Sequence, residues 1–283
     1  MTAPRPRAAF ERAPFAVSWA KHTRHRRDPS ARESDRVASQ HIETDAGRRI
    51  AYNLTPGRGP CIVFLGGFMS DMGGTKAVHL EAWAKAQGRA FLRFDYSGHG
   101  ESSERFEDGA IGDWAADAAA AIETLTEGPV VLAGSSMGGW IALLVARRIG
   151  RVAGFVGIAA APDFTEDSMW AGFTAGQRRD LETEGRVMLP SDYDAPYPVT
   201  RRLIEDGREN LVLRAPAPPM GVVRLLQGTD DAEVETNVAL RLLAHLDGDV
   251  RLTLVRGADH RFSTPECLAL IEAALGDVLE RAV

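Results

Sequence analysis

A serine between two glycines stands where an apolar run gives way to a helical pattern. Residues 130–132 are typical of a buried strand, and residues 137–149 have the composition of an apolar helix. Gly134 and Gly138 form a Gly-x-Ser-x-Gly spacing, which leaves the room that a strained corner requires. The start of the helix would direct unpaired N–H groups and a partial positive charge towards this corner. We therefore predict that Ser136 is a nucleophile; an ordinary strand-to-helix turn is the alternative.

A serine nucleophile needs a general base that accepts its proton. Two histidines follow Ser136 in the chain. His245 lies within a helical pattern, where a histidine usually has a structural role. His260 instead lies in a loop directly after the apolar run at residues 251–255, and loops after strands are common positions for catalytic side chains. We therefore predict that His260 is the base.

The base in turn needs a carboxylate that orients its ring. Asp230 and Asp231 both follow a strand pattern that ends near Gly228. The spacing Gly-x-x-Asp-x-x-Val, completed by Val234, favours Asp231 and leaves Asp230 as a loop or helix-capping residue. Asp259 is a third candidate, although neighbouring residues rarely direct their side chains at each other.

Acyl transfer also needs N–H donors for the oxyanion that forms at the attacked carbonyl group. The first donor that we predict is the N–H of Met137, directly after the serine. Gly66 and Gly67 follow a buried strand pattern and allow close approach of the backbone, so we predict the N–H of Phe68 as the second donor and Gly67 as a substrate contact. A simple turn at the glycine pair is the alternative.

The pattern of elements predicts an α/β fold with a doubly wound, mostly parallel sheet. An antiparallel hairpin at residues 41–54 precedes a regular alternation of strands and helices. In such sheets the ligand binds beyond the carboxyl ends of the strands, where all the candidate residues fall. Further strands are expected at residues 61–65, 90–94, 152–159, 222–226 and 251–255, and helices at residues 75–87, 112–127, 137–149, 234–246 and 265–279.

The alternation is interrupted at residues 162–219, which are rich in Pro, Asp, Glu and Arg. We predict two or three short helices there, inserted at the carboxyl edge of the sheet as a lid. Its apolar side chains are expected to line an acyl-binding slot above Ser136, or else to fix the lid to the sheet: Met169, Trp170, Phe173 and Met188. Its arginines are expected to attract anionic leaving groups, or else to pair with nearby carboxylates: Arg178, Arg179, Arg201 and Arg202.

Charge divides the chain into two parts. Residues 1–40 carry an excess of five positive charges, although the whole chain has a net charge of −6. We predict a flexible basic extension at residues 1–38 and one folded domain at residues 39–283. The extension lacks the hydrophobic core of a secretion signal, so we expect a cytoplasmic protein, with organelle import as a minor alternative. The acidic domain argues against nucleic acid as a partner, and no apolar run is long enough to span a membrane.

Two cysteines, Cys61 and Cys267, are too few for a disulfide framework or a metal site. Both fall in apolar patterns, so we expect buried thiols. The sequence predicts no metal ion and no cofactor.

Three segments together resemble one family. Residues 64–76, residues 93–100 and residues 134–140 are similar to the mitochondrial acyl-protein thioesterase and acyl-glucuronide esterase branch of the α/β-hydrolase superfamily. The resemblance implies the α/β-hydrolase fold, with Ser136, Asp231 and His260 as the triad of a serine hydrolase that acts on S-acyl or ester-linked carboxylic acids. The chain has Gln227 where this branch usually has His and Glu235 where it usually has Pro, and we expect neither change to affect the chemistry.

The sequence therefore predicts a serine hydrolase that cleaves esters or thioesters of small acylated substrates through an acyl-enzyme. A peptidase, a carbon–carbon bond hydrolase or a perhydrolase could use the same triad. A non-catalytic binding protein on the same scaffold is the alternative from a different class.

Overall fold

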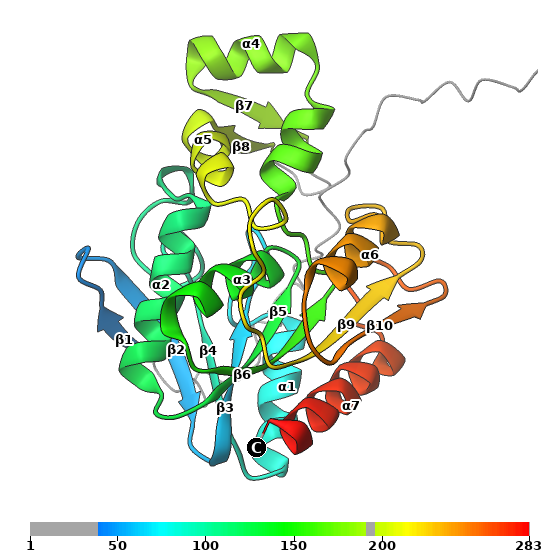
Figure 1. Ribbon diagram of the computed structural model, residues 1–283. Helices are drawn as coiled ribbons and strands as arrows, with labels where there is room; N and C mark the ends of the chain where they lie inside the picture. Colours follow the sequence, from blue (N-terminus) through cyan, green and yellow to red (C-terminus); the bar gives the residue numbers. More distant parts are fainter. Residues whose placement is uncertain (1–38, 191–195, 283) are drawn as a thin grey trace, which may run out of the picture.

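The computed structural model describes residues 39–190 and 196–282, which are built around an eight-stranded sheet (Figure 1). The strands lie in the order β1-β2-β4-β3-β5-β6-β9-β10. The pairs β1–β2 and β2–β4 are antiparallel, and all other neighbours in the sheet are parallel. The strands are β1 (Gln40–Glu43), β2 (Arg49–Thr55), β3 (Arg58–Leu65), β4 (Arg89–Phe94), β5 (Val130–Ser135), β6 (Val152–Ile158), β9 (Val222–Gly228) and β10 (Val250–Val255).

Helices cover both faces of the sheet, as its doubly wound topology requires (Figure 1). One face carries α2 (Ile111–Leu125), α3 (Met137–Ile149) and α6 (Thr236–His245), and the other carries α1 (Thr75–Ala86) and α7 (Pro265–Arg281). The central strands β3 and β5 are buried on both faces, which explains their continuous apolar runs. The parallel α/β architecture expected from the sequence is confirmed.

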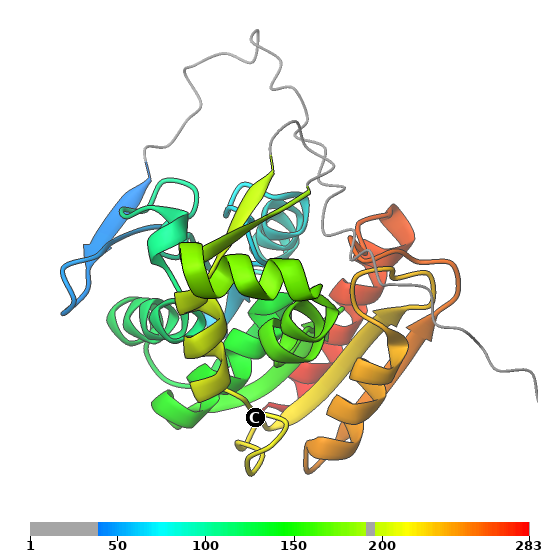
Figure 2. The same cartoon turned by 90° about the horizontal axis from the view of Figure 1, so that it is seen from above.

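The segment between β6 and β9 lies above the carboxyl edge of the sheet (Figure 2). We call this segment, residues 159–221, the insertion. The sequence predicted only helices there, but the insertion also contains a two-stranded antiparallel hairpin. Each of its strands has four residues, too few for an alternating pattern to be recognised. The elements are a π-helical turn η3 (Thr165–Trp170), α4 (Ala175–Glu184), β7 (Arg186–Leu189), β8 (Tyr197–Thr200) and α5 (Arg201–Glu209).

A buried carboxylate joins the two ends of the insertion. Asp163, at its start, accepts hydrogen bonds from the backbone N–H groups of Val212 at 2.7 Å and Leu213 at 3.1 Å, near its end. Arg214 adds an ion pair at 2.8 Å, and the Asp163 side chain is fully buried. The insertion is thus anchored where it leaves and re-enters the sheet.

The predicted extension at residues 1–38 lies outside the described residues. Within the described ranges, no helix combines the length and the apolar character needed to cross a membrane.

Candidate active site

Ser136 occupies a sharp corner between β5 and α3. Its backbone has φ 54° and ψ −119°, a conformation that few residues other than glycine adopt. A Cβ atom at position 134 would lie 2.5 Å from the Gly138 carbonyl oxygen, and one at position 138 would lie 2.0 Å from that of Leu65. Both glycines of the sequence pattern are therefore required by backbone contacts. The corner places the serine hydroxyl at the carboxyl edge of the sheet, before the first turn of α3.

His260 connects the serine to a carboxylate. Its Nε2 lies 3.0 Å from the Ser136 Oγ, and its Nδ1 lies 2.9 Å from the Asp231 Oδ2. The parallel register of β9 and β10 pairs Gly228 with Val255, so the loops after these strands run side by side and bring the two side chains together. The serine and the histidine are more than nine-tenths buried, and the Asp231 side chain is fully buried.

The Asp231 carboxylate accepts hydrogen bonds on both oxygens. Its Oδ1 accepts from the backbone N–H groups of Glu233 at 2.9 Å and Val234 at 2.8 Å. Burial acts to raise the pKa of Asp231, but the hydrogen bond and charge of His260, together with the hydrogen bonds from the Val234 N–H and the Gln227 side chain, bring the pKa below its usual value. The carboxylate is therefore ionised at neutral pH, as an orienting partner of a histidine must be.

The two other candidate acids have different partners. Asp230 is exposed and interacts with the Thr229 hydroxyl, and the Asp259 carboxylate accepts from the Phe262 N–H. The Gly-x-x-Asp-x-x-Val spacing thus selected the aspartate that the structure places against His260.

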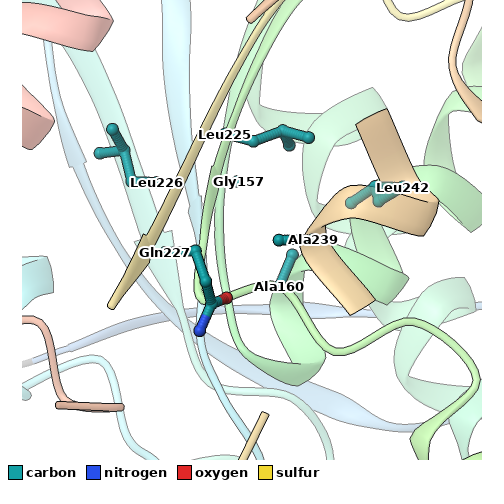
Figure 3. A pocket seen from close by; sticks show the side chains of 7 residues that line it. All are labelled: Gly157, Ala160, Leu225, Leu226, Gln227, Ala239 and Leu242. Carbon is teal, nitrogen blue, oxygen red and sulfur yellow. The ribbon is translucent and has the colours of Figure 1, made fainter. Parts of the chain in front are cut away.

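Gln227 touches the same carboxylate, a contact that the sequence did not indicate. Its Nε2 donates to the Asp231 Oδ2 at 2.8 Å and to the Val234 carbonyl oxygen at 3.1 Å. Because it is the penultimate residue of β9, its side chain reaches the loop that carries the acid. Figure 3 shows this side chain at a small pocket that has no room for a water molecule. The pocket is lined by Gly157, Ala160, Leu225, Leu226, Gln227, Ala239 and Leu242.

The loop after β3 lies directly against Ser136. The register of β3 and β5 pairs Leu65 with Gly134, so both strands end at the same level. A Cβ atom at position 67 would lie 3.4 Å from the Ser136 Cβ, which shows how closely the Gly67 backbone approaches. Among the described residues, the backbone N–H groups of Phe68 and Met137 have no hydrogen-bond acceptor. Both are thus available for an oxyanion.

The Phe68 ring anchors this loop in a cluster of aromatic side chains. Its centroid lies 4.9 Å from that of Phe106 and 6.2 Å from that of Tyr197, the first residue of β8. Beside the cluster, a groove of about 510 Å³ opens between the insertion and the loop after β4. We call it the aromatic groove; its lining residues are Met69, Arg105, Phe106, Glu107, Pro196, Tyr197 and Pro198.

The apolar residues expected to line a slot in the insertion have different environments. Met169 and Phe173 are buried in the main core, and the Met188 side chain is about half exposed. The guanidinium groups of Arg208 and Arg178 lie 4.4 and 5.0 Å from the centroid of the Trp170 ring. Trp170 therefore packs between side chains of α4 and α5 and holds the insertion together.

The arginines of the expected anionic rim are mostly engaged. Arg178 packs on Trp170 and donates to its carbonyl oxygen. Arg202 forms an ion pair with Asp113 at 2.6 Å, and Arg201 lies 3.7 Å from Glu205. Of the four, Arg179 alone has an exposed side chain with no partner among the described residues. This arrangement matches the alternative in which the arginines pair with nearby groups.

Sequence reasoning missed two polar groups at this site, Glu233 and Tyr197. The Glu233 Oε2 lies 3.4 Å from the His260 Nε2, the nitrogen that faces Ser136, and its side chain is only 10% exposed. The Tyr197 hydroxyl is buried and has no hydrogen-bond partner among the described residues. Neither residue belongs to a recognisable motif, and each reaches the site only through folding of its loop or hairpin.

Comparisons with known proteins agree with this architecture. The profile of the alpha/beta hydrolase family matches residues 62–273. The mitochondrial palmitoyl-protein thioesterase ABHD10 of Rattus norvegicus is 32% identical over 82% of this chain and 79% of its own length. A crystal structure of a putative hydrolase from Agrobacterium vitis is 37% identical, with a TM-score of 0.82 over 86% of this chain and 98% of its own. Mouse alpha/beta hydrolase domain-containing protein 10 is 29% identical, with a TM-score of 0.80 over 87% of this chain and 100% of its own.

These comparisons contradict the cytoplasmic location expected from the sequence. The rat relative and its human counterpart, both 32% identical to this chain, are mitochondrial proteins. The expectation was wrong because the lack of a hydrophobic signal core argues only against secretion. Mitochondrial targeting segments are Arg-rich and also lack such a core, so that absence does not indicate the cytoplasm.

Proposed function

Because the chain belongs to the alpha/beta hydrolase family, we propose that it is a serine hydrolase that cleaves carboxylic esters or thioesters through an acyl-enzyme. The observation that carries the proposal is a relay of two contacts at hydrogen-bond distance, one between Ser136 and His260 and the other between His260 and Asp231. In this proposal Ser136 is the nucleophile, His260 the general base and acid, and Asp231 the group that fixes the tautomer of the imidazole.

The geometry supports the following sequence of steps. The Ser136 Oγ attacks the carbonyl carbon while its proton passes to the His260 Nε2. The resulting oxyanion accepts hydrogen bonds from the N–H groups of Phe68 and Met137. Collapse of the tetrahedral intermediate breaks the bond to the leaving oxygen or sulfur, which takes the proton from the Nε2. Water, deprotonated by the same nitrogen, then attacks the acyl-enzyme; the bond between the acyl carbon and the Ser136 Oγ breaks, the Oγ takes the proton back from the Nε2, and the carboxylic acid is released.

We propose the aromatic groove as the site of the acyl chain. It is open, it has apolar walls from Met69, Phe106 and Tyr197, and it lies beside the ring of Phe68. The slot that the sequence suggested would instead need Met169 and Phe173, which are buried in the core. Truncation of Met69 should therefore reduce activity on long acyl chains more than on short ones.

We propose that the insertion acts as a lid. Its position over the carboxyl edge of the sheet and the aromatic contacts of β8 with the loop after β3 support this role. The anchored ends at Asp163 and Val212 confine any movement to the part between them.

Labelling with a fluorophosphonate and a substrate panel test the enzymatic proposal. The wild type should be labelled and should hydrolyse p-nitrophenyl esters and acyl thioesters, whereas Ser136→Ala should be neither labelled nor active. A binding protein on the same scaffold would leave all these substrates intact. If Ser136→Ala keeps more than a few per cent of the activity, the proposed nucleophile is wrong.

A further inference from the structure

We propose that Glu233 makes the leaving-group side of the site selective for alcohols or thiols that carry a positive charge. The inference rests on the serine hydrolase mechanism proposed above. It concerns a different part of the substrate from the acyl chain, namely the group that departs when the acyl-enzyme forms.

The position of Glu233 follows from the chemistry of His260. In the proposed mechanism the Nε2 of this ring gives its proton to the leaving oxygen or sulfur, so that atom must come within hydrogen-bond distance of the nitrogen. The Glu233 Oε2 lies 3.4 Å from the same nitrogen. The leaving atom therefore passes within about 6.5 Å of this oxygen in any productive pose.

Burial makes this charge effective. The Glu233 side chain is 10% exposed, so an interaction with a substrate charge is screened less than at an open surface. Burial raises the pKa of Glu233, while the charge of His260 acts to lower it. The other ionisable neighbours are Asp231, Arg261 and Asp259, together with Tyr197 and Lys76.

These neighbours leave an excess of negative charge. With Glu233 ionised and His260 neutral, the carboxylates of Glu233, Asp231 and Asp259 outnumber the cations of Arg261 and Lys76. Burial also lowers the pKa of Lys76 to about 8, so that its positive charge is partly lost under mildly alkaline conditions. A cationic leaving group would restore the balance, whereas an anionic leaving group would add to the repulsion.

The experiment compares butyryl thioesters that differ only in the charge of the thiol. Thiocholine provides the cation, 2-mercaptoethanol the neutral group and 3-mercaptopropionate the anion, and the released thiol is measured with a disulfide dye at pH 8. The readout is the ratio of kcat/KM for the cationic and the anionic thioester. Because every variant meets the same pair, the intrinsic reactivities of the two thioesters cancel when ratios are compared between variants.

Glu233→Gln should lower this ratio at least about fivefold relative to the wild type. Glu233→Asp, which keeps the charge, should stay within about twofold of the wild type. The matched control is Glu235→Gln, because Glu235 is exposed and its removal should not change the ratio. Labelling of Ser136 by a fluorophosphonate establishes that each variant is folded, and Glu233→Ala removes the same charge if glutamine is not tolerated.

The ratio decides the inference. If Glu233→Gln or Glu233→Ala keeps the wild-type ratio within about twofold, Glu233 does not select the leaving group. Failure of the proposed function gives a different result, because either the wild type would hydrolyse none of the three thioesters or Ser136→Ala would still hydrolyse the neutral one.

Discussion

Replacement of Asp231 by asparagine tests the proposed relay where the structure constrains it most. The Oδ1 of this carboxylate accepts two backbone N–H groups, from Glu233 and Val234, which cannot turn away. The carbonyl oxygen of an asparagine must therefore stay at this position. Its NH₂ group then faces the Nδ1 of His260, where the carboxylate oxygen was.

The consequence is a change of tautomer. An NH₂ group can only donate to the His260 Nδ1, so the proton of the neutral ring moves to the Nε2. The Nε2 then no longer accepts the proton of Ser136. We expect kcat to fall about 10⁴-fold, the size that this change causes in a serine protease triad. Asp230→Asn is the matched control; because Asp230 is exposed, we expect its activity to stay within about twofold of the wild type.

The same variant predicts a dependence of stability on pH. The pKa of Asp231 lies below its usual value, so the ionised carboxylate stabilises the fold above the unfolded pKa, about 3.9. This contribution is lost as the pH falls through the folded pKa. The difference in melting temperature between the wild type and Asp231→Asn should therefore shrink as the pH falls below about 4. Thermal melts at a series of pH values measure this effect.

Steady-state kinetics measure the effect of Asp231→Asn on kcat. If Asp231→Asn keeps more than a tenth of the wild-type activity, the proposed relay is wrong.

The remaining predictions concern the corner, the insertion and the extension. Gly138→Ala should be strongly destabilised, because its Cβ atom would lie 2.0 Å from a carbonyl oxygen. The matched control Gly276→Ala, in open space on a helix, should melt at the same temperature as the wild type or a higher one. Equal melting temperatures of Gly138→Ala and the wild type would contradict this account. Trp170→Ala should lower the melting temperature and reduce activity on long and short acyl chains by the same factor, because the ring packs between two arginines. A larger effect on long chains would instead show that Trp170 lines an acyl-binding slot. Deletion of residues 1–36 should leave melting temperature and turnover near those of the full chain, and a large loss of either would show that this segment contributes to the fold.

The two glycines around Ser136 were predictable because the corner leaves no room for a side chain at either position. Gly134 is required by contacts within the strand–turn–helix unit itself, and Gly138 by the end of the neighbouring strand β3, so their spacing in the sequence already describes the corner. His260 was predictable from the sequence for a related reason. A parallel sheet aligns the carboxyl ends of its strands, and a polar residue shortly after the last strand must lie at that edge.

The insertion was harder to predict, because its structure depends on contacts between distant segments. Trp170 is a large apolar residue of the kind that lines acyl-binding slots, yet its ring lies against Arg178 and Arg208 from two other elements. The four-residue strands of the hairpin are stabilised by each other and carry no pattern of their own. Composition indicates that such a segment is present, but not which of its side chains face the substrate.

Gln227 and Glu233 show why a sequence pattern can identify the reacting residues without describing what controls them. Gln227 donates to the Asp231 carboxylate because it is the penultimate residue of β9, from where its side chain reaches the loop that carries this acid. Glu233 follows Asp231 by two residues and reaches the opposite nitrogen of the His260 ring. One short segment thus supplies a carboxylate near each nitrogen of the base, and the two have different environments. Asp231 accepts four hydrogen bonds and orients the ring, whereas Glu233 lies near the path of the leaving group. If Glu233 selects the leaving group as proposed, variation at position 233 changes which leaving group is accepted while Ser136, His260 and Asp231 stay the same.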